Sequence, residues 1–286
     1  EETDRLSTMV EELLEIKRKF ADDRRTEIVD SEDDIDIEDL IERHECVITL
    51  TDSGYIKRLP VSEYRAQGRG GKGIRAMATK EEDYIESVMS VNSHSNILLF
   101  TNFGKVYTSK PYRIPEASYN AKGTNIVNLL ELADGEKITA VLPVESLAAE
   151  NLDEDYLVMI TRQGVIKRTR LAEYSYQRRG GKIAINLDED DELIFVRHTR
   201  GDESLIIATR NGQAVRFDEN NVRCMGRSAH GVKGITLTGD DYVVGVAVVD
   251  EDKWLLTVTE NGMGKRTSFE DFREMKHRGG KGVTCH

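Results

Sequence analysis

The first part of the chain alternates apolar and charged positions with the period of a helix. Its apolar residues recur mostly at three- and four-residue steps, so they form one stripe on a helix. They are Leu6, Met9, Val10, Leu13, Leu14 and Phe20. The pattern predicts a helix from residue 1 to about 27 whose stripe packs against another surface. The strongly acidic stretch 30–42 follows, and we interpret it as a solvated linker.

From residue 46 the pattern changes to short apolar runs separated by glycine turns. The segment CVITLTDSGYIKR (46–58) predicts a strand, a turn centred on Gly54 and a second strand that ends in Lys-Arg. The same pattern returns four times, at 96–108, 156–168, 205–217 and 254–266. The later turn glycines are Gly104, Gly164, Gly212 and Gly262. The β-branched content and the glycine turns favour strands over buried helix.

A repeat of about 50 residues is typical of a propeller or a solenoid. After each hairpin a polar, often basic connection leads to a short predicted strand, such as 126–130 or 183–187, and then to another, such as 138–142 or 193–197. Four strands form one propeller blade, and a single blade cannot cover its own apolar faces. We therefore expect an all-β fold of stacked four-stranded sheets over residues 46–286, preceded by the helix and acidic linker of residues 1–45.

The charge distribution separates the same two parts. The chain carries a net charge of −12, but residues 1–45 hold 18 acidic and 7 basic residues, so the rest is nearly balanced. A balanced body can still present one basic face to a polyanion. No apolar run is long enough to span a membrane, and the three cysteines are far apart. These features favour a reduced, cytoplasmic setting without membrane contact.

The sequence offers no catalytic or metal-binding constellation. The segment GRGGKG (68–73) fits GxGxxG in form, but no parallel strand and helix flank it, and no phosphate-binding GxxxxGK[ST] loop is present. The histidines and cysteines lack metal-ligand spacing, and no nucleophile has an activating base nearby. We expect no cofactor, no metal and no enzymatic activity in this part of the chain.

Each hairpin is instead followed by a lysine beside glycine. The five copies are GGKG at 70–73, AKG at 121–123, GGK at 180–182, VKG at 232–234 and GGKG at 279–282. Glycine lets backbone N–H groups approach an anion, and Lys and Arg add charge-assisted hydrogen bonds. Loops repeated at one phase predict a basic rim that follows the phosphates of a bent DNA duplex. The candidate rim cations are Lys57, Arg58, Arg65, Arg75, Lys122, Lys167, Arg168, Arg178, Arg179, Lys182, Lys233, Arg278 and Lys281.

The heptapeptide QGRGGKG at 67–73 closely resembles the QRRGGKG box of the bacterial DNA gyrase A family, and departs from it at Gly68. RRTEI (24–28) resembles the exit from the coiled-coil arm of that family, and DIEDLI (36–41) resembles its connector. The resemblance implies a C-terminal β-pinwheel of six blades that exchange strands with their neighbours. Five copies are visible here, so the sixth blade is missing from this sequence.

The resemblance also implies a function. The pinwheel of this family wraps duplex DNA and supports ATP-dependent negative supercoiling by an A2B2 holoenzyme formed with gyrase B, whereas ATP and Mg bind elsewhere. It assigns wrapping to the box residues Gln67, Arg69, Gly70, Gly71, Lys72 and Gly73. We expect the isolated chain to be monomeric. Two alternatives stay open: the related C-terminal domain of topoisomerase IV, which bends DNA without full wrapping, and a propeller-like platform for protein interactions.

Overall fold

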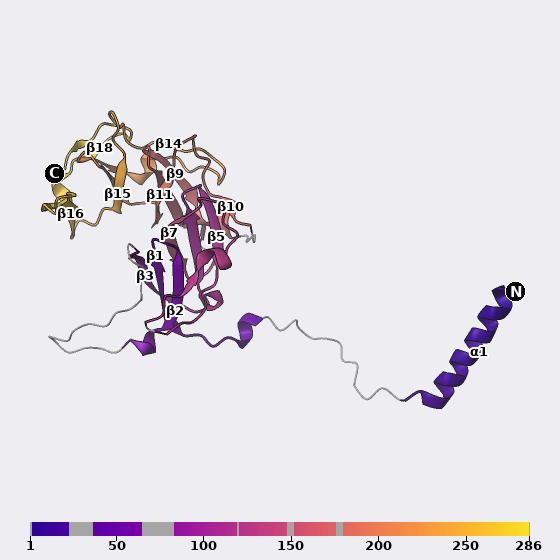
Figure 1. Cartoon of the computed structure of the whole chain (residues 1–286). Coiled ribbons are helices and arrows are strands. Elements are labelled where there is room, and N and C mark those ends of the chain that lie inside the picture. The colour runs from indigo at the N-terminus through magenta and orange to yellow at the C-terminus, as the bar shows by residue number, and fades with distance from the viewer. Residues whose placement is uncertain are drawn as a thin grey trace. The chain divides into compact units, whose positions relative to one another are not determined.

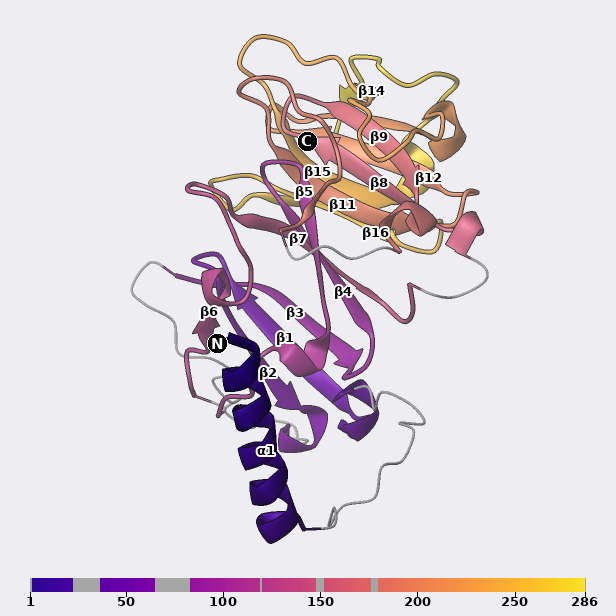
Figure 2. The same cartoon turned by 90° about the vertical axis from the view of Figure 1, so that its right-hand side faces the viewer.

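The computed structural model describes residues 2–22, 37–64, 83–118, 120–147, 152–175 and 180–285. The chain forms two compact units, Glu1–Leu40 and Ile41–His286. The first unit contains α1 (Glu2–Phe20) and a 3₁₀ turn (Ile37–Leu40), and the second is built from strands (Figures 1 and 2).

The predicted N-terminal helix is confirmed, but α1 ends at Phe20, and residues 23–27 lie outside the described residues. Lys17, Arg18 and Lys19 occupy its last turn, where cations interact favourably with the helix dipole. Asp22 follows two residues after the last helical residue, and an acidic residue is disfavoured near that end of a helix. The apolar stripe is exposed within this unit. None of the helices among the described residues offers the long apolar run that crossing a bilayer needs.

All five predicted hairpins are present in the second unit. Their strands are β1 (Glu45–Thr51) with β2 (Tyr55–Pro60), β4 (Asn96–Thr101) with β5 (Lys105–Ser109), β8 (Tyr156–Thr161) with β9 (Val165–Arg170), β12 (Ser204–Thr209) with β13 (Gln213–Asp218), and β16 (Trp254–Val258) with β17 (Gly264–Ser268). The first strands of the first four hairpins are almost completely buried, because they lie in the middle of their sheets. Short 3₁₀ turns follow the second strands, at Val61–Glu63, Pro111–Arg113, Leu171–Tyr174, Glu219–Asn221 and Phe269–Asp271.

A third strand pairs with the first strand of each of the first four hairpins. These strands are β3 (Ile85–Asn92), β7 (Ile138–Val144), β11 (Leu193–Thr199) and β15 (Val243–Val248). They confirm the strands predicted at 138–142 and 193–197. Strands β7 and β11 also pack against each other, so the third strands bring neighbouring sheets together.

The fourth strand of each sheet comes from the next repeat. These strands have two residues each: β6 (Thr124–Asn125), β10 (Lys182–Ile183), β14 (Val232–Lys233), β18 (Glu274–Met275) and β19 (Val283–Thr284). Strand β6 pairs with β2, β10 with β5, β14 with β9, and both β18 and β19 with β13. The strands predicted at 126–130 and 183–187 are wrong in position and length, because of these residues only Ile183 lies in a strand. A 3₁₀ turn occupies Ile126–Asn128, because Asn125 caps it by accepting a hydrogen bond from the Val127 amide.

This exchange confirms the strand-swapped, pinwheel-like arrangement. Four sheets have at least four strands, whereas β16 and β17 form a two-stranded sheet among the described residues. The apolar cores lie between successive sheets: one contains Ile48 and Leu99, the next Phe100 and Met159, and a third Val158 and Ile207, with similar neighbours around each. Each repeat therefore depends on the next both for burial and for one strand.

Glycines at the hairpin turns let the segment from the next repeat lie directly against the turn backbone. The Gly104 carbonyl accepts a hydrogen bond from the Ala184 amide at 2.7 Å, and its φ is +72°. A Cβ at Gly104 would lie 2.5 Å from the Ile185 carbonyl oxygen. At Gly262 φ is +80°, but a Cβ would meet nothing within 4 Å.

We expect Gly104→Ala to lower the free energy of unfolding by about 3 kcal/mol, because strain from positive φ adds to a backbone clash. Gly262→Ala is the matched control, and it should cost only about 1 kcal/mol for the same φ. Urea unfolding of both variants measures the difference. Equal losses would show that the exchanged segment does not press on the turn.

Candidate nucleic-acid interface

The four described basic glycine loops lie where the two-residue strands join the sheets, and Figure 1 labels β10, β14 and β18 among these strands. A glycine with positive φ precedes one such strand in each described loop. These glycines are Gly123 (+79°), Gly181 (+73°), Gly231 (+100°) and Gly282 (+80°). A Cβ at Gly282 would lie 2.5 Å from the Ala214 carbonyl oxygen, and one at Gly181 would lie 2.8 Å from the Tyr107 ring. The glycines thus allow the loops to lie directly on the preceding hairpin.

Successive loops touch each other. The Asn186 amide donates to the Ala229 carbonyl at 3.2 Å, and the Thr236 amide donates to the Gly280 carbonyl at 2.9 Å. Residues 180–188, 226–237 and 276–282 therefore form one continuous surface, which we call the loop track. The loop of the second repeat adjoins it through Tyr107, which packs on Gly181 and donates to the Glu131 carbonyl at 2.9 Å.

The lysines of the loops do not share one structural position. Lys122 and Lys281 come directly before the positive-φ glycine, Lys182 comes directly after it, and Lys233 follows it by two residues. In the four described loops the glycine, and not the lysine, keeps one position relative to the paired short strand. The pairing of the short strands fixes the phase through the glycine, and the lysine varies around it.

Several predicted cations are available at the surface of these loops. Lys233 and Lys281 are exposed, and Lys122, Lys182 and Arg278 are partly exposed. The Lys122 ammonium lies 3.8 Å from the centre of the Tyr55 ring, a cation–π contact. The predicted rim cations did not include Arg223 and Arg227, which lie in the fourth loop where GGK is absent. Lys276, one of the cations that flank GGKG in the fifth loop, is exposed. Their signal is the basic run within RCMGRSAHGVKG and KHRGGKG.

Two predicted rim lysines are wrong because they are buried. Lys57 and Lys167 are 0% exposed. The Lys57 ammonium donates to the carbonyls of Ser118 (3.2 Å) and Ala121 (3.1 Å) in the next loop. Burial lowers the pKa of Lys57. These bonds tie a hairpin to the loop that covers it, so the ammonium does not reach the surface.

Lys167 holds two loops at once. Its ammonium donates to the Ala184 carbonyl at 2.6 Å and to the carbonyl of Arg227. Burial, with the nearby positive charge of Arg227, lowers the pKa of Lys167 to about 8. Lys167 therefore joins the third loop to the fourth from below the surface.

The arginines that follow these lysines are also structural. The Arg58 side chain is 11% exposed, donates from Nε to the Ile114 carbonyl at 3.2 Å and pairs with Glu116 at 3.5 Å. Arg168 is 7% exposed and pairs with the fully buried Glu219 at 3.7 Å. Both reach the 3₁₀ turn region of the next repeat, so their prediction as surface phosphate ligands is wrong.

The remaining predicted residues lie outside the described residues. They are Arg65, Gln67, Arg69, Gly70, Gly71, Lys72, Gly73, Arg75, Arg178 and Arg179. Their proposed contacts with DNA stay predictions.

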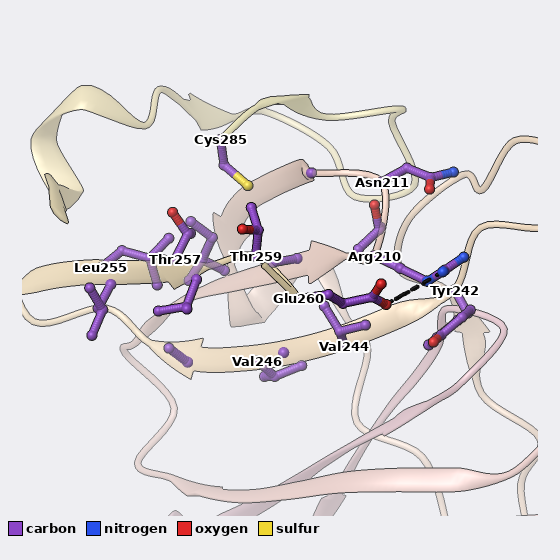
Figure 3. Close-up of a pocket in the computed structure, with 18 of the residues that line it drawn as sticks. Arg210, Asn211, Tyr242, Val244, Val246, Leu255, Thr257, Thr259, Glu260 and Cys285 are labelled. Carbon is purple, nitrogen blue, oxygen red and sulfur yellow. Dashed lines mark hydrogen bonds and ion pairs between the residues drawn. The ribbon is translucent and has the colours of Figure 1, made fainter. Parts of the chain in front are cut away.

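A groove of about 650 Å³ lies between the fourth sheet and β16 (Figure 3). Apolar side chains such as Val244 and Leu256 line it, and at one end the Arg210 Nε lies 3.4 Å from a Glu260 carboxylate oxygen. No group of three or more His, Cys, Asp or Glu in the described part of the chain is arranged to hold a metal ion.

Sheets that exchange short strands and carry basic glycine loops on their outer edge define a β-pinwheel, a propeller-like class of domain. The family described as "DNA gyrase C-terminal domain, beta-propeller" matches residues 47–92, 95–145, 155–200, 203–250 and 253–285. The chain belongs to this family. The five matched segments coincide with the five hairpin repeats.

Relatives and solved structures agree with this assignment. The chain is 48% identical over 282 residues to the DNA gyrase A protein of Staphylococcus epidermidis, and 47% identical over 284 residues to that of Staphylococcus aureus. Each alignment covers 97% of this chain and 31% of the relative, so the chain spans about a third of the length of these proteins.

Among solved structures, the C-terminal domain of DNA topoisomerase IV matches with a TM-score of 0.71 at 28% identity, over 85% of this chain and 73% of that one. The DNA gyrase A C-terminal domain matches with 0.67 at 33% identity, over 84% and 76%. The E. coli ParC C-terminal domain, at 17% identity, shares the fold with a TM-score of 0.63 over 84% and 94%.

Proposed function

We propose that this domain binds duplex DNA by its phosphates and wraps it along the loop track. The observation that carries the proposal is the continuity of the track: loops from three successive repeats are hydrogen-bonded side by side and present exposed lysines. Backbone contacts of this kind hold a duplex without reading its bases. The proposed phosphate ligands among the described residues are Lys122, Lys182, Lys233, Lys276 and Lys281.

The box at 67–73 extends this proposal by sequence. Its GGKG is repeated at 279–282, where the lysine is exposed beside a positive-φ glycine. We assign Gln67, Arg69, Gly70, Gly71, Lys72 and Gly73 to the start of the wrap, with Arg65, Arg75, Arg178 and Arg179 as further phosphate ligands. In the whole protein, wrapping would support negative supercoiling by an A2B2 gyrase assembled with gyrase B, and ATP and Mg would act outside this chain.

Topoisomerase IV is the second candidate, because its C-terminal domain matches this fold with a TM-score of 0.71. Two observations favour gyrase. Identity to gyrase A proteins is 47–48% over nearly the whole chain, and the box departs from the gyrase sequence at one position. The two candidates differ in whether bound DNA is wrapped or only bent.

The salt dependence of binding tests the phosphate-binding proposal against a protein-interaction platform. If about eight phosphates are neutralised, a plot of log K against log salt concentration should have a slope of about −7. Titration of the full chain into a labelled duplex at several salt concentrations measures the slope. A flat dependence, or no binding at low salt, would contradict DNA binding through this rim.

A further inference from the structure

Arginines in two neighbouring loops make the same contact one repeat apart. Arg227 donates from Nη1 to the Ile183 carbonyl at 3.0 Å, and Arg278 donates from Nη1 to the Lys233 carbonyl at 2.7 Å. Each arginine lies four residues before the positive-φ glycine of its own loop. Each acceptor lies two residues after the glycine of the preceding loop. The glycines concerned are Gly181, Gly231 and Gly282.

A second pair of bonds repeats with the same register. Five residues after Gly181, Asn186 donates from its amide to the Ala229 carbonyl at 3.2 Å and from Nδ2 to the Ser228 carbonyl at 2.6 Å. Five residues after Gly231, Thr236 does the same one repeat later. Its acceptors are the carbonyls of Gly280, 2.9 Å from the amide, and Gly279, 2.6 Å from the hydroxyl. Each neighbouring pair of loops thus shares one arginine bond and two bonds from a single polar residue.

Arg278 makes more hydrogen bonds than its place in the basic segment HRGGKG suggests. Besides Nη1, its Nε donates to the Asn221 carbonyl at 3.0 Å. The planar guanidinium reaches two carbonyls on different segments with two separate nitrogens, whereas a lysine would have to reach both from the single nitrogen of its ammonium group. Lys281, three residues later, is exposed instead. Arg278 and Lys281 therefore have different roles in this loop.

We propose that Arg227 and Arg278 are positioning residues that fix the spacing of successive DNA-contacting loops, together with Asn186 and Thr236. The inference rests on the proposed function, since the spacing matters only if the loops hold one DNA backbone. Phosphates lie at regular intervals along a duplex, and bending it requires that several loops hold it at once. Loosening one junction should then reduce wrapping more than it reduces binding.

Charge-conserving exchanges separate positioning from phosphate binding. Arg278→Lys keeps the charge but replaces the two donor nitrogens that bond the Asn221 and Lys233 carbonyls by one. We expect this contact to weaken and the change in linking number per bound chain to fall by at least half. The slope of log K against log salt should stay within about one unit of the wild type, because few phosphate contacts are lost. Arg200→Lys is the matched control, because Arg200 is exposed in the connection between β11 and β12, outside the loop track, and it should preserve both quantities. Thr236→Val removes the hydrogen bond from the Thr236 hydroxyl to the Gly279 carbonyl without any change of charge, and it should reduce wrapping as Arg278→Lys does.

Amide hydrogen exchange without DNA provides a readout that is independent of wrapping. In Arg278→Lys the Thr236 amide should exchange about tenfold faster, as expected when one supporting hydrogen bond is lost, whereas Arg200→Lys should leave it unchanged. The inference is overturned if Arg278→Lys wraps DNA like the wild type, or if Thr236 exchange does not respond. If the wild type itself leaves the linking number unchanged, the proposed function fails, while the exchange measurement still tests the junction.

Discussion

Replacing Arg69 and Lys72 together by alanine should abolish the change in linking number that the full chain imposes on closed circular DNA. Bending a duplex of tens of base pairs through about 40–90° costs roughly 1–6 kcal/mol. The bend therefore needs all the phosphate contacts along the domain, including those of the box at the start of the wrap. Binding should persist, with the salt slope falling from about −7 to about −5 as two phosphate contacts are lost. The protein is bound to closed circles, a relaxing enzyme acts on the complex, and the linking number is measured after the protein is removed.

The matched control removes two cations from connections between sheets. Arg200 and Lys253 are exposed and lie in the turns that precede β12 and β16. Arg200→Ala with Lys253→Ala lowers the net charge equally but should preserve the linking-number change. A box-specific role is wrong if Arg69→Ala with Lys72→Ala reduces wrapping and binding by the same factor.

Glu219→Ala should lower the free energy of unfolding by about 3–5 kcal/mol, the largest effect that we expect from a single substitution in the second unit. The Glu219 carboxylate is fully buried and accepts hydrogen bonds from the Thr199 hydroxyl (2.7 Å) and from the amides of Gly201 (2.9 Å) and Glu203 (3.0 Å). Its removal would leave these donors unpaired and the Arg168 guanidinium without its buried counter-charge. Chemical denaturation of the variant measures the loss.

Glu116 provides the control, because it pairs with Arg58 as Glu219 pairs with Arg168, but its side chain is 55% exposed. Water screens such a pair, so Glu116→Ala should cost about 1 kcal/mol or less. If both glutamates cost the same, burial does not set the strength of these junctions between repeats.

The hairpins and the N-terminal helix were predictable from the sequence because each depends on its own residues. Apolar runs, turn glycines and helical periodicity are local signals, and all five hairpins follow them. The two-residue strands were not predictable from pattern alone, because their partners lie in the preceding repeat, far away in the chain. Only the resemblance to the gyrase family implied that strands are exchanged.

The site shows the same division. The sequence identified the basic loops, but it assigned Lys57 and Lys167 to the surface. Alternation within their strands carries no sign that a loop from the next repeat covers these positions and offers carbonyls to the ammonium groups. Arg278 was likewise selected for its charge, whereas its contacts with two backbone carbonyls come from a loop and a turn some 50 residues earlier in the chain.

The change in linking number produced by the unmodified chain tests the central claim most directly. The chain is bound to relaxed closed circles at increasing ratios of protein to DNA. A relaxing enzyme then removes the compensating supercoils from the part of each circle that the protein does not hold. The topoisomers are counted after the protein is removed. The account predicts a shift of one sign that grows in proportion to the bound chain and disappears at high salt. Saturated binding that leaves the topoisomer distribution unchanged would contradict it.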